Sequence, residues 1–460
     1  LLCSYGNSNN NLSHQILRTL STNCDHLLNQ GYVMANFPKL TSKELIKQHF
    51  TPTTKIIDLR PTAAHNGWPL RAEKRGGHIP QAISFPLRWF SELSQAKILL
   101  ILQSKDIHSS TDIILTGYSE DETETAAHKL LSLGFNSLSI HEGGMLAYLE
   151  DEELPVRSLP RYKHLVHPEW LKRILSSNRS EKDIVLAHVS FDNWGDYNEG
   201  HIPGAIWLDT LALEDETTWN HRTNTELEEE LCAHGINKDS MVILYGRTAN
   251  PNMSQEQPGQ QAGQLASMRA ALLLMFAGVR DVYVLDGGLD AWIREGGSIT
   301  RDETLPTKIE SSRLIIPEHP EYITLIDKAK QYLSDPQSEL VSVRSWEEFI
   351  GEVSGYHYIE KKGRIPGAVF GNCGSDAYHM ENYRNHDDSM RSLCEIEAIL
   401  FESELTPDKN LAFYCGTGWR ASEAWFCTWL MGWEHVSIFD GGWFEWSNDP
   451  KNPFEIGTPE

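Results

Sequence analysis

Two short phrases, each present three times, constrain the fold of this 460-residue chain more than any other feature. The first phrase contains Ile-Pro and reads GHIPQA at 77–82, GHIPGA at 200–205 and GRIPGA at 363–368. The second contains Gly-Gly and reads HEGGMLAY at 141–148, LDGGLDAW at 285–292 and FDGGWFEW at 439–446. The two phrases alternate along the chain, and successive pairs are about one ordinary domain length apart. The chain is therefore predicted to contain three tandem copies of one domain.

Each copy repeats the same order of segments. An apolar stretch typical of a buried strand precedes the Ile-Pro phrase, and these stretches are 56–60, 184–189 and 340–344. A second apolar stretch follows that phrase, at 112–117, 241–246 and 411–416. A helix and a third strand then lead to the Gly-Gly phrase. Apolar strands that alternate with helices predict an α/β fold, with a mostly parallel β-sheet covered by helices on both faces.

The repeat also predicts the domain boundaries, because the pattern lapses in polar segments that contain proline. We expect an N-terminal arm and helix, then three units of similar size, at 1–34, 35–155, 164–304 and 318–457. The second unit contains a Gln-rich insertion at 249–264, which is predicted to be a mobile loop.

Composition excludes several classes of partner. The formal net charge of −24 is unfavourable for binding nucleic acid or an anionic membrane surface. No segment approaches the roughly 18 apolar residues of a membrane span. The seven cysteines form no close pairs, which argues against a disulfide framework. Because the sequence begins with Leu1 rather than Met, we expect a processed periplasmic protein, with the cytoplasm as the alternative. The tandem copies favour a monomer.

The loop after the second apolar stretch separates the third copy from the others. It reads Cys-Gly-Thr-Gly-Trp-Arg from Cys415 to Arg420, whereas the first two copies have Thr116 and Tyr245 at the cysteine position. Such a loop, between a parallel strand and a helix, is the usual ligand position in an α/β sheet. The first two copies are therefore predicted to be inactive and the third to be catalytic.

The residue types in this loop indicate the chemistry. Gly416 and Gly418 allow the backbone to form a cradle of N–H groups. The helix N-terminus and the Arg420 guanidinium add positive charge, which favours a Cys415 thiolate and an anionic ligand. The loop is thus predicted to support nucleophilic sulfur chemistry.

The order of segments, the Cys415 loop and the Gly-Gly phrases resemble the rhodanese family of sulfurtransferases, over about residues 38–455. Three tandem domains with one cysteine-bearing copy are typical of a bacterial type within that family. The resemblance implies that Cys415 takes the outer sulfur of a small anionic donor, thiosulfate or else 3-mercaptopyruvate, as a persulfide. It also implies that the sulfur then passes to cyanide in an assay, or to a thiol or partner protein in the cell. No metal and no organic cofactor are implied.

The same resemblance assigns residues to the site. The persulfide is expected to lie among the N–H groups of the loop, with Arg420 as the anion-binding residue. The substrate-binding residues are then Gly416, Thr417, Gly418, Trp419 and Arg420. Trp419 either lines the mouth of the pocket or packs in the core.

Two other functions are compatible with a cysteine on this fold. Cys-dependent phosphatases place five residues between cysteine and arginine, whereas here four residues separate Cys415 from Arg420, which favours sulfur. A protein-binding sulfur-relay module is the second alternative, in which the first two domains dock a partner and the third delivers persulfide sulfur to it.

Overall fold

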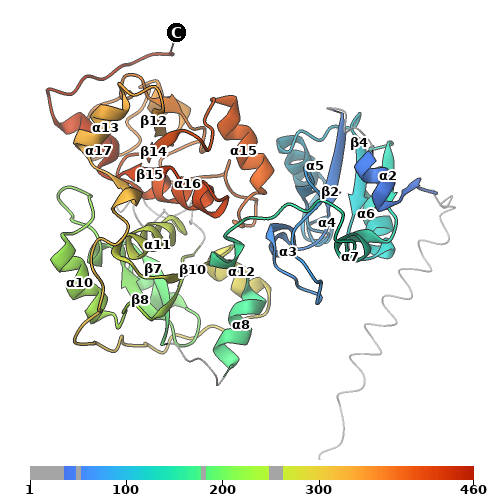
Figure 1. Cartoon of the computed structure of the whole chain (residues 1–460), viewed down its shortest axis with the longest axis horizontal. Helices are drawn as coiled ribbons and strands as arrows, with labels where there is room; N and C mark the ends of the chain where they lie inside the picture. Colours follow the sequence, from blue (N-terminus) through green and yellow to red (C-terminus); the bar gives the residue numbers. More distant parts are fainter. Residues whose placement is uncertain (1–35, 48–52, 178–182, 248–262, 460) are drawn as a thin grey trace, which may run out of the picture.

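The structure is a computed structural model that describes residues 36–47, 53–177, 183–247 and 263–459. In these ranges the chain forms three α/β domains in sequence order, here called domains 1, 2 and 3 (Figure 1). The predicted N-terminal arm and helix, and all but the last two residues of the Gln-rich insertion, lie outside the described residues. Within the described ranges, no helix is both long and apolar enough to cross a membrane.

The elements of domain 1 follow the predicted order. Its strands are β1 (Lys39–Leu40), β2 (Thr54–Asp58), β3 (Ile83–Ser84), β4 (Asp112–Thr116) and β5 (Leu138–His141). Its helices are α2 (Ser42–Lys47), α3 (Thr62–Asn66), α4 (Trp89–Glu92), α5 (Gln95–Ser104), α6 (Glu120–Ser132) and α7 (Gly144–Glu150).

Domain 2 repeats this order. Its strands are β6 (Leu165–Val166), β7 (Ile184–Ser190), β8 (Ile206–Asp209), β9 (Met241–Tyr245) and β10 (Asp281–Leu285). Its α-helices are α8 (Pro168–Ser176), α9 (Trp194–Glu199), α10 (Asn224–Ala233), α11 (Leu265–Ala277) and α12 (Gly288–Arg294). Two 3₁₀ turns are η1 (Tyr162–His164) and η2 (Thr210–Ala212).

Domain 3 has the same plan. Its strands are β11 (Ile323–Thr324), β12 (Ser338–Ser342), β13 (Val369–Phe370), β14 (Asn410–Tyr414) and β15 (Val436–Phe439). Its helices are α13 (Ile326–Tyr332), α14 (Trp346–Phe349), α15 (Leu393–Glu402), α16 (Trp419–Leu430) and α17 (Gly442–Asn448), with a 3₁₀ turn η4 (Pro320–Tyr322).

All three sheets have five parallel strands in one topology. The spatial orders are β1-β5-β4-β2-β3, β6-β10-β9-β7-β8 and β11-β15-β14-β12-β13. The α/β fold with parallel sheets is therefore confirmed. The edge strands β1, β6 and β11 were not predicted, because each is only two residues long and too short to show a hydrophobic period.

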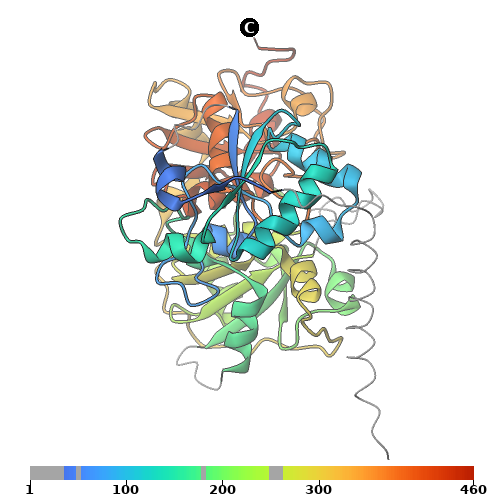
Figure 2. The same ribbon diagram turned by 90° about the vertical axis from the view of Figure 1, so that its right-hand side faces the viewer.

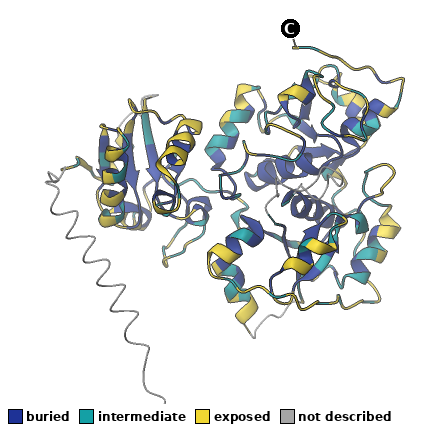
Figure 3. Cartoon of the chain, turned by 180° about the vertical axis from the view of Figure 1, so that it is seen from behind, coloured by how far each residue is buried: buried dark blue, intermediate teal, exposed yellow. Residues whose placement is uncertain are grey.

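Domains 2 and 3 share one hydrophobic core. Helices α11 and α16 pack against each other between the two sheets (Figure 1). Every residue of both helices is buried, and they form a dark blue pair in the middle of the larger, right-hand body in Figure 3. A helix that is buried on all sides lies inside a larger core. One cluster of buried side chains accordingly runs from domain 2 through both helices into domain 3.

Domain 1 has its own core and docks at the junction of the other two domains (Figure 2). The Trp68 indole N–H donates to the carbonyl of Leu165 in domain 2 at 3.0 Å. On the other side, Lys105 Nζ lies 2.8 Å from the carboxylate of Glu395 in domain 3. Domain 1 is therefore joined to domain 3 by ion pairs and to domain 2 by the packing of Trp68, whereas domains 2 and 3 share a continuous apolar core.

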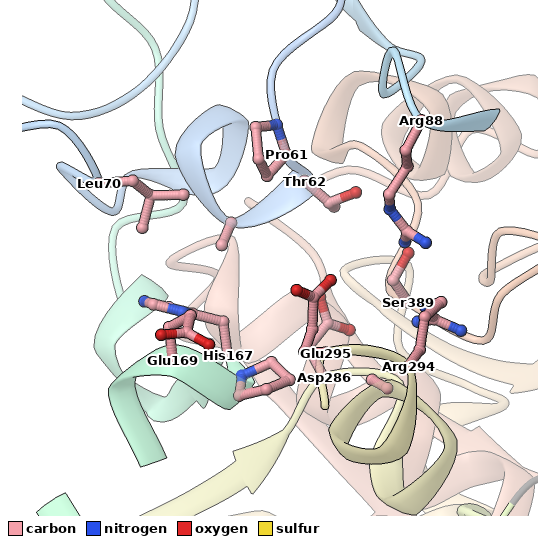
Figure 4. A pocket seen from close by; sticks show the side chains of 13 residues that line it. Pro61, Thr62, Leu70, Arg88, His167, Glu169, Asp286, Arg294, Glu295 and Ser389 are labelled. Carbon is pink, nitrogen blue, oxygen red and sulfur yellow. The ribbon is translucent and has the colours of Figure 1, made fainter. Parts of the chain in front are cut away.

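A pocket of about 150 Å³ lies where the three domains meet (Figure 4). Its lining combines side chains from all three domains, among them Arg88, His167, Asp286 and Ser389. Asp286 follows β10, and its carboxylate accepts the backbone N–H of Met390 in domain 3 at 2.8 Å. Burial raises the pKa of Asp286 to about 7. Among its lining residues this pocket has no cysteine, so it is separate from the predicted sulfur site.

The Asp286→Asn variant is expected to lose less unfolding free energy than the wild type as pH rises. The folded carboxyl stays protonated up to pH about 7, whereas an unfolded aspartate ionises near pH 4. Its contribution to stability is therefore present at acidic pH and is lost as pH rises through 7. Between pH 5 and pH 8, the wild type should lose about 2 to 3 kcal/mol of unfolding free energy relative to the variant. Urea unfolding at the two pH values measures this difference.

Asp440→Asn is the matched control. Asp440 is the equivalent residue after β15, but it lies 2.7 Å from the buried guanidinium of Arg269. Burial would raise the pKa of Asp440, yet Arg269 holds it below the usual value. This variant should be less stable than the wild type at both pH values. The same response to pH in both variants would contradict the assignment.

Candidate active site

Cys415 lies at the carboxyl end of the central strand β14 of domain 3, one residue after Tyr414. The loop 415–418 then turns into α16, whose first residue is Trp419. Cys415 itself is fully buried. The sequence analysis placed Thr116 and Tyr245 at the equivalent positions of domains 1 and 2, but these residues end β4 and β9 as Tyr414 ends β14. The residues equivalent to Cys415 are Gly117 and Gly246, because their carbonyls accept the same supporting backbone N–H as that of Cys415. The structure therefore places the cysteine of domain 3 where an α/β sheet ordinarily presents its ligand-binding loop.

The Gly-Gly phrase of domain 3 supports this loop through backbone hydrogen bonds. The backbone N–H groups of Trp443 and Phe444 donate to the carbonyls of Cys415 and Gly416 at 2.8 and 2.9 Å. Gly442 permits the contact, because it has a φ of +53° and a Cβ there would lie 2.7 Å from the Cys415 carbonyl oxygen. The phrase that identified the repeat is thus the support of the Cys415 loop.

Domains 1 and 2 keep the same support for their loops without a cysteine. Met145 N–H donates to the carbonyl of Gly117 at 2.8 Å, and Leu289 N–H donates to that of Gly246 at 2.9 Å. The support for the loop therefore exists in all three domains, with a cysteine on it in domain 3 and a glycine at the same position in domains 1 and 2.

The loop backbone forms the predicted cradle. Within the described ranges, the backbone N–H groups of Gly416, Thr417 and Gly418 have no hydrogen-bond acceptor. Gly418 adopts a φ of +91°, which a side chain would disfavour. Unpaired N–H groups at the start of a helix are suited to an anionic sulfur or oxyanion.

Gly442→Ala is expected to displace the catalytic loop. The new methyl group would meet two backbone carbonyls, at 2.7 Å for Cys415 and 2.9 Å for Gly416, and backbone atoms cannot move aside cheaply. Unfolding free energy should fall by about 3 kcal/mol, and sulfur transfer should fall with it. Gly204→Ala is the control, since Gly204 also has a positive φ of +83° but has no atom near its missing Cβ. Equal losses in both variants would mean that strain, and not the loop contact, causes the effect.

A buried trio of charges lies beside the loop. Arg420 donates to both carboxylate oxygens of Glu348, at 2.8 and 3.0 Å, and Arg344 lies 3.1 Å from the same carboxylate. Burial would raise the pKa of Glu348, but Arg420 and Arg344 outweigh it and hold the pKa at about 2. Two guanidinium groups therefore share one carboxylate, which leaves one positive charge in the trio. Arg420 is thus held by Glu348 and by the carbonyl of Asp376 at 2.8 Å.

Tyr356 connects this trio to the loop. Its hydroxyl accepts from Arg420 at 3.1 Å and donates to the carbonyl of Ala377 at 3.2 Å. Its ring packs over the loop, since a Cβ on Gly416 would lie 2.2 Å from a ring carbon. Burial raises the pKa of Tyr356 well above its usual value, so the phenol stays protonated.

Aromatic side chains surround the loop, and we call them the aromatic rim. Its members are Tyr356, Tyr358, Tyr378, Phe444 and Trp219. The ring centroids of Trp219 and Tyr358 are 5.6 Å apart, and Trp219 belongs to domain 2. All members except Tyr356 are partly exposed. The rim is therefore a partly buried aromatic cluster with members from domains 2 and 3.

Trp419 points away from the loop toward domain 2. Its indole N–H donates to both carboxylate oxygens of Glu214, at 3.1 and 3.0 Å. Its ring lies 5.6 Å from that of Phe191, also in domain 2. Of the predicted site residues, Cys415, Gly416, Thr417 and Gly418 form the cradle, whereas the side chains of Arg420 and Trp419 are engaged with carboxylates.

The sequence analysis did not identify Glu348, Tyr356, Glu214 or Trp219. A local signal existed only for Glu348, because Ser345-Trp-Glu-Glu348 reads as a capping box, and α14 begins with that motif. Glu214 and Trp219 belong to domain 2, and they lie near the loop because α11 packs on α16. Among the described residues, no group of three His, Cys, Asp or Glu side chains is arranged to hold a metal ion.

The Rhodanese-like domain family matches this sequence three times, at residues 41–151, 167–295 and 325–449. The thiosulfate sulfurtransferase YnjE of Escherichia coli (strain K12) is 35% identical over 413 residues, which is 88% of this chain and 89% of YnjE. A probable 3-mercaptopyruvate sulfurtransferase of Pseudomonas aeruginosa is 30% identical over 62% of this chain and 96% of its own length.

Solved structures of EanB are also similar. The wild-type EanB structure has a TM-score of 0.89 and 45% identity, and covers 93% of this chain and 99% of EanB. The anaerobic ergothioneine biosynthesis enzyme of Chlorobium limicola, solved with trimethyl histidine, has a TM-score of 0.88 and 44% identity, over 92% of this chain and all of that one. An EanB variant was solved as a cysteine persulfide in a tetrahedral intermediate state with ergothioneine.

Proposed function

Because this chain belongs to the rhodanese-like domain family and is a sulfurtransferase, we propose that it transfers sulfur from a persulfide on Cys415 to the imidazole ring of a trimethylated histidine. The product would be the corresponding thiolated betaine, as in EanB. The observation that carries this proposal is the aromatic rim beside the cysteine loop. A thiosulfate-to-cyanide reaction needs no such surface.

The rim suits a trimethylammonium group. A quaternary ammonium cation has no N–H to donate, and aromatic faces attract it through their electron density. Tyr358 lies at the centre of the rim, with ring centroids 5.3 Å from Tyr356 and 6.2 Å from Phe444. Trp219 stacks on its other side, at 5.6 Å. A cation on this surface would place the remainder of a small betaine toward Cys415.

Residue spacing supports the same substrate class. EanB structures with hercynine or ergothioneine include variants at a tyrosine 59 residues before the persulfide cysteine, and at a threonine two residues after it. In this chain Tyr356 stands 59 residues before Cys415, and Thr417 stands two residues after it. Both residues contact the loop or belong to it, so we assign them to the acceptor site.

The proposed reaction has two steps. In the first, the Cys415 thiolate attacks the outer sulfur of a sulfane-sulfur donor, the donor S–S bond breaks, and the donor leaves with that electron pair. The loop N–H groups of residues 416–418 stabilise the anionic persulfide. In the second, an imidazole ring carbon forms a bond to the outer sulfur, the Cys–S bond to that sulfur breaks, and Cys415 leaves as thiolate. The ring carbon then loses its proton to give the thione.

Thiosulfate sulfurtransferase activity is the second candidate. The 35% identity to YnjE and the one net positive charge of the Arg344, Glu348 and Arg420 trio favour an anionic donor. The two candidates share the first step and differ in the acceptor. The C-G-x-G pattern of the loop is also compatible with 3-mercaptopyruvate as the sulfur donor.

One experiment separates the two candidates. The purified protein is incubated with polysulfide and hercynine, and ergothioneine is measured by liquid chromatography and mass spectrometry. A parallel reaction with thiosulfate and cyanide measures thiocyanate. The proposal expects ergothioneine in many turnovers, and no product from Cys415→Ser. Thiocyanate without ergothioneine would overturn the proposed acceptor and favour a thiosulfate sulfurtransferase.

A further inference from the structure

A segment of domain 2 reaches the catalytic loop of domain 3. It follows β8 and includes Glu214, which is fully buried although it carries no role in its own domain's cysteine-less site. Both of its carboxylate oxygens accept the indole N–H of Trp419, the first residue after the Cys415 loop. In the same segment, the backbone N–H of His221 donates to the carboxylate of Asp440 at 2.8 Å. Domain 2 therefore contacts both ends of the structure that supports Cys415.

Arg269 of α11 joins these two contacts. Its guanidinium lies 2.7 Å from the carboxylate of Glu214 and 2.7 Å from that of Asp440. It also passes close to the loop, because a Cβ on Gly418 would lie 3.2 Å from its Nη1. All three charged side chains are fully buried. A carboxylate, a guanidinium and a carboxylate thus form one continuous link around the loop.

Asp440 connects Arg269 to the backbone turn that supports Cys415. It directly precedes Gly441 and Gly442, and the next two backbone N–H groups hold the carbonyls of Cys415 and Gly416. The loop is consequently held at Trp419 by Glu214 and at Cys415 by the turn that Arg269 fixes. Both holding residues come from domain 2.

The equivalent position on the other side of the interface is built differently. The fifth residue of α11 is Arg269, and the fifth residue of α16 is Glu423. Glu423 pairs with Arg384 of its own domain. The helix residue is therefore the acid of this pair, whereas in the pair of Arg269 with Glu214 the helix residue is the base. Asp286, the counterpart of Asp440, accepts a backbone N–H from domain 3. In the part of the chain that the structure describes, the fully buried link at 2.7 Å therefore crosses between the two domains on the side of the cysteine, whereas the opposite side has a looser, partly exposed pair of Arg294 and Asp387 at 3.9 Å.

A buried ion network of this kind contributes little net stability to a fold. Desolvation of a buried ion pair cancels much of its Coulombic attraction, and apolar side chains of similar size often stabilise as well. Burial raises the pKa of Glu214 to about 7, against the attraction of Arg269. A buried network of this kind fixes geometry more than it adds stability.

We propose that Glu214 and Arg269 of domain 2 are positioning residues that hold the Cys415 loop in the form that accepts and releases sulfur. A domain without a cysteine would then be a required part of the active site. The inference rests on the persulfide step of the proposed function and is independent of the acceptor.

The test compares two buried glutamates of the same interface in the full-length protein. Glu214→Gln removes the charge from the link, and Glu423→Gln removes it from the pair in domain 3. Each variant is loaded with polysulfide and assayed with cyanide, and kcat and KM for polysulfide are measured. The rate of Cys415 alkylation by iodoacetamide and the thermal midpoint are measured alongside. Glu214→Asp, which keeps the charge and shortens the side chain, covers the case in which Glu214→Gln does not fold.

Glu214→Gln or Glu214→Asp should lower kcat about tenfold or more, with KM for polysulfide changed less than about twofold, because a displaced loop slows the reaction. Cys415, which is fully buried, should be alkylated about tenfold faster. Glu423→Gln should lower the thermal midpoint without changing either rate. Equal kcat values in the two Gln variants at similar midpoints would overturn the proposal, as would a changed KM with unchanged kcat. Cyanide as acceptor keeps this result separate from the question of the betaine.

Discussion

Replacing Cys415 by serine should abolish sulfur transfer, with a fall of at least about a thousandfold in kcat/KM. Serine is nearly the same size as cysteine, so the buried position at the end of β14 should stay filled. A hydroxyl, however, is a much weaker nucleophile than a thiolate and cannot form a persulfide. Intact mass after treatment with polysulfide measures the first step directly, as the gain of one sulfur atom in the wild type.

Cys394→Ser is the control for this result. Cys394 is only partly buried and lies at the contact between domains 1 and 3, where its thiol donates to the carbonyl of Ala82 at 3.6 Å. Polysulfide can load any accessible thiol, so the mass gain must be mapped to a peptide. The control should keep the full rate of transfer. Product formation by Cys415→Ser at more than a few per cent of the wild-type rate would contradict the role of the loop.

Glu348→Gln should have the largest effect on stability, a loss of about 3 to 5 kcal/mol of unfolding free energy. Removing the carboxylate charge leaves Arg344 and Arg420 buried side by side with like charges. Because the pKa of Glu348 is about 2, the carboxylate is ionised at every pH above 4. The stability it contributes is present above the unfolded pKa and is lost only as pH falls toward 2. The difference between variant and wild type should therefore be constant from pH 6 to pH 8 in urea unfolding.

The same substitution should also slow the reaction, because Arg420 is the second residue of α16 and its partner fixes the start of that helix. Asp58→Asn is the matched control in domain 1, where Asp58 pairs with the buried Arg60 at 2.7 Å. It should lower stability without changing the alkylation rate of Cys415. Glu348→Gln with unchanged stability would show that the two guanidinium groups find other acceptors.

The fold was predictable, and Cys415 could be chosen as the candidate nucleophile, because both signals are local. The apolar stretches that became β2, β7 and β12 were recognised from five or six consecutive residues. The predicted ends of the first and third stretches lay two residues too far, and that of the second lay one residue short. Arg344, placed in the third stretch, follows β12 and joins the charge trio. Cys415 was assigned from its own loop, since a strand, a thiol and two glycines are contiguous in the chain.

The function was predictable only at the level of the reaction class. The aromatic rim is the feature that favours a trimethylated acceptor, and its members are spread from Trp219 to Phe444. Each aromatic side chain alone is an ordinary core residue in the sequence. The loop sequence therefore does not determine the acceptor, which depends on residues that only the fold brings together.

By itself the sequence determined the three parallel-sheet domains and the position of the nucleophile, because repetition, hydrophobic pattern and glycine placement are properties of neighbouring residues. Only the tertiary structure decided which groups surround Cys415. The carboxylate that engages Arg420 comes from Glu348, 72 residues earlier, and the one that engages Trp419 comes from Glu214, 205 residues earlier in another domain. Buried charges find partners wherever packing brings them within a few ångströms, and the packing of α11 on α16 is a property of the whole chain.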